Sequence, residues 1–108
     1  MYDLTWCGGI SEGKKISDMA NTYYLPTMMH TSGGPLLWYS SLHLAAAVTN
    51  LFYVESVYPE WYDRNPLYFE NPPQVVKGFA SPPDLPGLGL QFKKGLFEQK
   101  DVIIEKIA

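Results

Sequence analysis

The run LPTMMH at residues 25–30 decides how the first half of the chain is interpreted. Its apolar residues are continuous rather than helically spaced, and Pro26 interrupts any helix through this segment. Proline is tolerated near the first position of a strand, so the run is predicted to be a short strand with Pro26 at its start. His30 then falls at the carboxyl end of that strand.

A helix is predicted on each side of this strand. Before it, residues 11–23 place apolar side chains at the spacing of one helical face, with Ser11 as the expected N-cap. The members of that face are Ile16, Met19, Ala20 and Tyr23. After the strand, a turn at residues 31–35 precedes a second helix over residues 36–48, which is apolar on most sides and should be packed on most sides.

The segment LFYV at residues 51–54 is continuously apolar, aromatic and β-branched, which suits a strand buried on both faces of a parallel sheet. Glu55 ends it, and Asp3 is expected at the end of an earlier strand. Residues 1–55 therefore alternate strand end, helix, strand, helix and strand. This alternation predicts an α/β fold with βαβ units on a parallel sheet.

Residues 56–86 have a different character, with most of the prolines, many aromatic residues and no sustained period beyond short extended pieces near residues 75–76 and 79–80. They predict an ordered extension that wraps over the surface. A turn-rich element at residues 82–89 follows, and then a tail that contains Val102, Ile103, Ile104 and Ile107. Because so few parallel strands cannot cover their own edges, we expect the chain to be incomplete as a folding unit.

Composition excludes several classes of function. The net charge is −3 and the lysines are scattered, so nucleic acid is not an expected partner. No apolar run approaches the roughly 20 residues that cross a bilayer, and no signal peptide is recognisable, so a protein without membrane contact is expected. Cys7 is the single cysteine, which excludes an internal disulfide and a multi-cysteine zinc site and fits a reducing cytoplasm.

Three side chains are candidates for chemistry because each follows a predicted strand. Asp3, His30 and Glu55 come from three successive strand ends. Barrel enzymes gather their catalytic groups at this edge, from the loops that follow the strands. The order and spacing of the three residues carry more information than any of them alone.

The surrounding motifs resemble the mandelate racemase and sugar-acid dehydratase branch of the enolase superfamily. They are DLTWCGGISEGKKI at residues 3–16, His30, GP at 34–35, SLHLAA at 41–46, Glu55 and PGLG at 86–89. The resemblance implies the C-terminal third of a (β/α)8 barrel of the TIM type, from the end of strand six through strand eight, over residues 1–56. Residues 57–108 would be an irregular C-terminal extension that packs on the barrel and on a capping domain.

The resemblance also implies roles for the three residues. Asp3 would hydrogen-bond one imidazole nitrogen of His30 and fix its tautomer, and His30 would carry a proton at the carbon next to the substrate carboxylate. Glu55 would hold that carboxylate. The implied catalytic residues are thus His30, Asp3 and Glu55, and the implied substrate-binding residues are Glu55 and His30.

Magnesium is the implied cofactor, held in the family by three acidic residues on strands three to five, with a second base on strand two. None of these strands corresponds to a part of this chain, so no metal ligand is assigned. Eight other acidic residues are interpreted as surface charges. They are Asp18, Glu60, Asp63, Glu70, Asp84, Glu98, Asp101 and Glu105.

Three functions remain open at this stage. The first is part of a magnesium-dependent acid-sugar dehydratase, which removes the α-proton and eliminates the β-hydroxyl as water, with this chain inactive alone. The second is a racemase or epimerase of a 2-hydroxy acid. In the third, Met1 lies inside the implied strand six, and the chain is a non-catalytic remnant that docks to the missing barrel.

Other features of the sequence leave the substrate open or have structural explanations. Expected partners are a small sugar or hydroxy acid, the rest of the barrel with its capping domain, and other copies of the protein, since the family is often homo-oligomeric. Met29 and Thr31 replace the commoner neighbours of the histidine, which leaves the substrate subgroup open. His43, Trp6 and Cys7 are interpreted as structural or packing residues, and residues 33–35 as a helix-start turn rather than a phosphate loop.

Overall fold

A small parallel sheet lies at the centre of the α/β half of the chain. The computed structural model describes residues 1–105, so the predicted tail residue Ile107 lies outside the described residues. Strand β1 spans Thr27–Met29 and pairs in parallel with β2, which spans Leu51–Val54. A parallel bridge between Tyr2 and Met29 adds the end of a third strand on the other edge of β1. The strand order is therefore Tyr2, β1, β2, as the alternating sequence pattern predicts.

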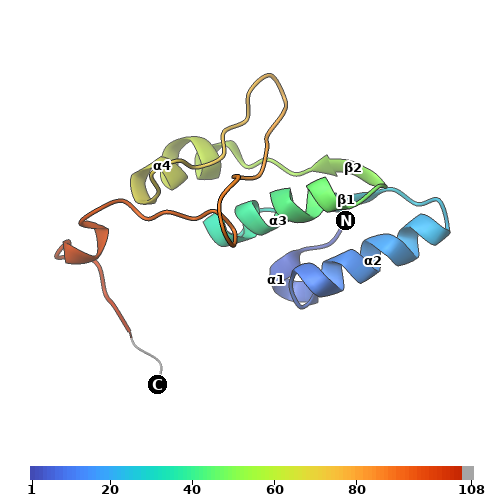
Figure 1. Ribbon diagram of the computed structural model, residues 1–108, viewed down its shortest axis with the longest axis horizontal. Coiled ribbons are helices and arrows are strands. Elements are labelled where there is room, and N and C mark those ends of the chain that lie inside the picture. Colours follow the sequence, from blue (N-terminus) through green and yellow to red (C-terminus); the bar gives the residue numbers. More distant parts are fainter. Residues whose placement is uncertain (106–108) are drawn as a thin grey trace.

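Three helices accompany these strands (Figure 1). The single turn α1 spans Leu4–Cys7, α2 spans Ile10–Thr22 and α3 spans Pro35–Ala47. The helices contact one another, and α3 also packs along β2. Both long helices predicted from the sequence are confirmed.

The predicted N-cap of α2 is wrong. The capping residue is Gly9, with a φ of +91°, and Ser11 lies one residue inside the helix, where it makes no capping hydrogen bond. Gly8 also has a positive φ, +105°, because the chain reverses between α1 and α2 through a conformation that only glycine adopts without strain. The glycine pair, rather than a serine side chain, sets where α2 begins.

The apolar face predicted for α2 does not face the core. Met19 and Tyr23 are 69% and 72% exposed, whereas the buried residues of α2 are Gly13 and Ser17. A Cβ at Gly13 would lie 2.5 Å from Cδ2 of Leu4 and 2.8 Å from Cδ2 of Leu44. The helix therefore approaches α1 and α3 through its small residues and leaves its large ones uncovered by the described chain.

Strand β2 is also less covered than its sequence predicts. Phe52 and Tyr53 are 61% and 63% exposed, so the expectation of a strand buried on both faces is wrong within residues 1–105. Only β1 pairs with β2 here, and the second edge of β2 is open. The apolar composition was recognised correctly, but the described residues do not supply the elements that would cover it.

Helix α3 connects two apolar clusters, which confirms that it is packed on most sides. The first cluster lies between the sheet and helices α1 and α3, and consists of Leu4, Met29, Leu37, Leu44 and Ala45. The second joins α3 to the extension and consists of Trp38, Tyr39, Leu42 and Trp61, with partly buried residues that include Leu88 and Leu90.

The extension after residue 56 contains helices that the sequence pattern did not reveal. Residues Pro59–Arg64 form a π-helical turn, η1, which continues into α4 at Asn65–Tyr68, and a short 3-10 turn, η2, spans Leu96–Glu98. A hairpin-like bridge joins Val76 and Phe79, where extended pieces were expected. Among the described helices, none is long and apolar enough to cross a membrane.

Candidate active site

The three predicted site residues meet at the carboxyl edge of the sheet. Asp3 follows the bridging residue Tyr2, His30 follows β1, and Glu55 follows β2. Backbone hydrogen bonds hold them in line, because His30 N donates to Tyr2 O at 2.8 Å and Glu55 N donates to Met29 O at 3.0 Å. The parallel ladder thus brings together residues that are 27 and 25 positions apart in the sequence.

Asp3 contacts His30 directly. Oδ2 of Asp3 lies 2.7 Å from Nδ1 of His30. An ionised carboxylate can only accept a hydrogen bond, so Nδ1 carries the hydrogen and Nε2 of the neutral ring is left with a free lone pair. The contact predicted between the two side chains is present, and it defines which nitrogen is available for chemistry.

The second oxygen of Asp3 is held by Thr5. Oδ1 accepts hydrogen bonds from both the backbone N, at 2.7 Å, and the hydroxyl of Thr5. Asp3 is also the N-cap of α1, so the same carboxylate begins that helix and orients the imidazole. Burial opposes ionisation of Asp3, but the hydrogen bonds from Thr5 and His30 outweigh it and lower the pKa of Asp3 below its ordinary value.

Glu55 approaches the other side of the imidazole. Its Oε2 lies 3.7 Å from Nε2 of His30, a distance that suits an ion pair with a protonated ring but is too long for a hydrogen bond. The side chains of His30 and Glu55 are 34% and 35% exposed, whereas that of Asp3 is 11% exposed. His30 and Glu55 are therefore accessible to a ligand, and Asp3 lies behind them.

Thr31 ties the ends of β1 and β2 together. Its backbone N donates to Oε2 of Glu55 at 2.9 Å, and its hydroxyl donates to the carbonyl oxygen of Glu55 at 2.7 Å. The sequence interpretation assigned no role to Thr5 or Thr31. The backbone contact of Thr5 follows from Asp3, because aspartate is a favoured N-cap residue that accepts from a backbone N–H in the first turn. The contact between Thr31 and Glu55 depends on strand pairing that local sequence does not encode.

The described residues do not form a magnesium site. Within residues 1–105 there is no group of three or more His, Cys, Asp or Glu side chains that could hold a metal ion. Both oxygens of Asp3 are already occupied by Thr5 and His30, so its carboxylate is committed to orienting the ring.

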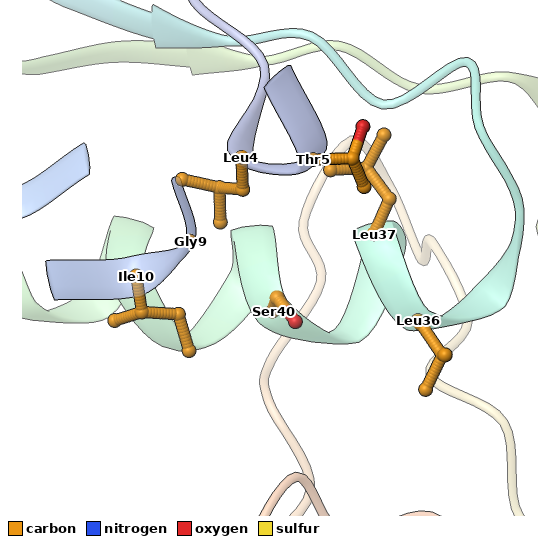
Figure 2. Close-up of a pocket in the computed structure, with 7 residues that line it drawn as sticks. All are labelled: Leu4, Thr5, Gly9, Ile10, Leu36, Leu37 and Ser40. Carbon is orange, nitrogen blue, oxygen red and sulfur yellow. The ribbon is translucent and has the colours of Figure 1, made fainter. Parts of the chain in front are cut away.

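An apolar cavity of about 170 Å³ does not include Asp3, His30 or Glu55 in its lining. Figure 2 shows the residues that line it. The cavity separates α1 and the start of α2 from the first turns of α3. Its lining residues are Leu4, Thr5, Gly9, Ile10, Leu36, Leu37 and Ser40. None of them carries a titratable side chain, and the cavity lies where the three helices pack against one another.

Other residues singled out in the sequence have clear positions. His43 contacts the carbonyl oxygen of Leu88 through Nε2 at 3.2 Å, which links α3 to the PGLG turn and agrees with a structural role. Cys7 packs against the first apolar cluster, as expected, but Trp6 is 89% exposed, so its interpretation as a packing residue is wrong within the described chain. Gly34 and Pro35 begin α3, which confirms the helix-start turn.

The eight acidic residues interpreted as surface charges lie outside the site. All are exposed except Glu60, which is half-buried and pairs with Arg64 at 2.6 Å. Their interpretation as surface charges therefore holds for seven of the eight.

Comparisons with known proteins agree with the fold and the motifs. Residues 1–96 match the family described as enolase C-terminal domain-like. The chain is 35% identical over 97 residues to arabinonate dehydratase of Saccharolobus solfataricus, and 34% identical over 90 residues to D-xylonate dehydratase of Haloferax volcanii. These matches cover 90% and 82% of this chain but only 26% and 21% of the two relatives.

A solved structure shows the same relation. An enolase protein from the environmental genome shotgun sequencing of the Sargasso Sea superposes with a TM-score of 0.77 at 34% identity, over 92% of this chain and 26% of that one. The chain thus spans about a quarter of the length of the proteins that it matches. On the match over residues 1–96, the chain belongs to the enolase C-terminal domain-like family of the enolase superfamily.

Proposed function

We propose that this chain supplies the acid/base side of the active site of a sugar-acid dehydratase. The observation that carries the proposal is the 2.7 Å contact between Asp3 and His30, which leaves Nε2 of His30 facing outward beside Glu55. The relatives named arabinonate dehydratase and D-xylonate dehydratase support this choice over other reactions of the superfamily.

The geometry suits His30 to proton transfer. Asp3 fixes the tautomer, so Nε2 can accept a proton and then return it. A protonated ring would lie between two carboxylates, with Nε2 exposed and able to donate its proton to a departing β-hydroxyl. Removing water from a sugar acid requires loss of the α-proton, which a base outside this chain would accept, and protonation of that hydroxyl, which His30 would supply.

Glu55 is proposed to bind the substrate. Its carboxylate is fixed by Thr31 and lies next to Nε2 of His30, so it can accept hydrogen bonds from the hydroxyl groups of a sugar acid. Magnesium, which the family resemblance implies, would be bound by carboxylates outside this chain. We accordingly propose that the chain is inactive without the remainder of the active site.

The arrangement of strands supports placing residues 1–56 at the end of strand six through strand eight of a (β/α)8 barrel. Tyr2, β1 and β2 are parallel neighbours in that order, and each of them is followed by a site residue. Residues 57–108 are proposed to pack on the barrel and the capping domain. The uncovered apolar residues of α2 and β2 are the surfaces that the remaining strands and helices would bury.

The proposal is tested by assaying the whole protein with magnesium and a panel of sugar acids that includes arabinonate, xylonate and galactonate. We expect a 2-keto-3-deoxy acid from at least one of them, and no product from the 108-residue chain alone. Deuterium incorporation at the α-carbon in D2O without loss of water would identify a racemase or epimerase instead. Absence of both reactions with every acid would contradict the proposed function.

A further inference from the structure

Thr31 directs all of its hydrogen-bond donors at one residue. Its side chain is almost completely buried, with 3% of the residue exposed. The backbone N donates to the carboxylate of Glu55 at 2.9 Å, and the hydroxyl donates to the backbone carbonyl of the same residue at 2.7 Å. A buried hydroxyl that finds its partner on the neighbouring strand fixes the spacing between the two strand ends.

The carboxylate oxygen that Thr31 holds is the one that faces His30. Oε2 of Glu55 accepts from Thr31 N and lies 3.7 Å from Nε2 of His30. A freely rotating glutamate could close onto a protonated ring or turn outward to water, since its side chain is 35% exposed. The contact with Thr31 favours an intermediate position that leaves Nε2 free of a direct hydrogen bond.

We propose that Thr31 is a positioning residue that sets the distance between the Glu55 carboxylate and His30, and so keeps the reactive nitrogen open to substrate. This inference rests on the proposed function, because its consequence for activity depends on His30 and Glu55 acting on a sugar acid. Its structural part, the placement of Glu55, stands independently and can be measured without any activity.

The hydroxyl is the part of Thr31 that substitution can remove. Thr31→Val keeps the shape of the side chain but leaves the Glu55 carbonyl without its donor, whereas Thr31→Ser keeps the donor. In the whole protein we expect Thr31→Val to lower kcat/KM by about tenfold, the effect of losing one hydrogen bond of ordinary strength, and Thr31→Ser to remain close to wild type.

A double-mutant cycle separates positioning from a general effect on stability. If Thr31 acts through the Glu55 carboxylate, Thr31→Val added to Glu55→Gln causes little further loss of activity. If the two losses multiply, Thr31 does not act through Glu55 and the inference is wrong. Circular dichroism checks that each variant is folded, and Thr31→Ala replaces Thr31→Val in the cycle if the valine variant does not fold.

Crystal structures of the wild type and of the folded variant provide the readout that does not depend on activity. Because the hydroxyl holds the backbone of Glu55, we expect its loss to let the end of β2 move and carry Oε2 away from its position near His30, whereas Thr31→Ser should keep Oε2 in place. An unchanged carboxylate in both would overturn the inference even if the enzyme is active. A whole protein that turns over no sugar acid would contradict the proposed function, while these structures would still decide whether Thr31 positions Glu55.

Discussion

At the scale of single residues, the site depends on how each polar atom is partnered. His30 has one nitrogen bound by Asp3 and the other left open, and each flanking carboxylate is held by a threonine. The two threonine hydroxyls have different partners. That of Thr5 donates to the carboxylate of Asp3, the N-cap of the same helix, and that of Thr31 donates to the backbone carbonyl of Glu55 at the end of the neighbouring strand. Asp3 therefore holds the imidazole directly and is itself held by Thr5, while Thr31 places the Glu55 carboxylate beside the open nitrogen.

The lowered pKa of Asp3 gives stability a defined dependence on pH. The folded state binds a proton at Asp3 less tightly than the unfolded chain, whose aspartate titrates near 3.9. The stabilisation is complete above that value and is lost as the pH falls through the lower pKa of the folded state. Urea unfolding should show that Asp3→Asn lowers stability at pH 7 and that its deficit shrinks below about pH 4.

The Thr5 hydroxyl provides a control for this dependence. Thr5→Val removes one of the hydrogen bonds that favour ionised Asp3, so part of the acid-sensitive stability should disappear while the contact with His30 remains. A deficit of Asp3→Asn that stays constant between pH 7 and pH 3 would show that the ionised form of Asp3 is not what stabilises the site.

The half-buried Tyr2 and the buried Tyr39 should respond differently to loss of the hydroxyl. The hydroxyl of Tyr39 has no hydrogen-bond partner among the described residues, and burial raises its pKa to about 12. The hydroxyl of Tyr2 is hydrogen-bonded to Ser17 at 2.6 Å. We expect Tyr2→Phe to lower the free energy of unfolding by about 1 kcal/mol and Tyr39→Phe to leave it unchanged or raise it. A larger loss for Tyr39→Phe in urea titrations would contradict this assignment.

At the scale of elements, hydrophobic periodicity and the positions of proline and glycine predicted where strands and helices lie. They did not predict which other elements cover them. The strand before His30, the helix after it and LFYV at residues 51–54 were all located from local pattern. The same pattern assigned Met19 and Tyr23 to the buried side of α2, although Gly13 and Ser17 occupy it. A helical period groups residues on one face, but which face meets a neighbour depends on elements distant in sequence.

The extension shows the second limit of local pattern. The π-helical turn η1 contains Pro59 at its start and a cluster of aromatic residues with no apolar period, so it resembles a loop in sequence. It is held by tertiary contacts, since Trp61 belongs to the cluster on α3 and its Nε1 donates to the Ser56 hydroxyl at 2.6 Å.

The contact between Asp3 and His30 was predictable only because a family resemblance supplied it.

The close approach of α2 to its neighbours can be tested at Gly13. A methyl group there would meet the buried side chains of Leu4 and Leu44 at less than 3 Å, so the core must shift to accept it. Overpacking costs about 1–3 kcal/mol, which exceeds the gain of up to about 1 kcal/mol from replacing glycine by alanine within a helix. Thermal or urea unfolding should therefore show that Gly13→Ala is destabilising.

Ser11→Ala is the matched control on the same helix, because Ser11 is exposed and makes no capping hydrogen bond. It should change stability by less than about 0.5 kcal/mol. A Gly13→Ala variant that is more stable than wild type would mean that α2 does not pack through this glycine.

At the scale of the whole molecule, the described chain has a parallel sheet with an open edge and large uncovered apolar side chains on β2 and α2. Open edges of this kind pair with other strands. In the proposed barrel, β2 would be followed around the closed sheet by a strand from outside this chain. The chain's length, about a quarter of its relatives, is consistent with that arrangement.

Lysine substitutions on β2 test whether this surface is covered. Phe52→Lys and Tyr53→Lys together should reduce self-association of the 108-residue chain, because charges on an open edge oppose strand pairing. In the whole protein the same pair should prevent folding or cost several kcal/mol, since buried unpaired charges are strongly unfavourable. Sedimentation velocity and urea unfolding measure the two effects, and a whole protein that tolerates both lysines would refute the proposed barrel placement.

Comparison of the two histidines in the whole protein tests whether His30 transfers the proton. His30→Gln should lower kcat for dehydration by about 10²–10⁴-fold, the usual contribution of a general acid or base, because it removes the proton carrier at the carboxyl edge of the sheet. His43→Gln, which keeps a donor for the Leu88 carbonyl, should leave kcat within about twofold of wild type. A His30→Gln enzyme that retains wild-type kcat would contradict the central claim that His30 transfers the proton.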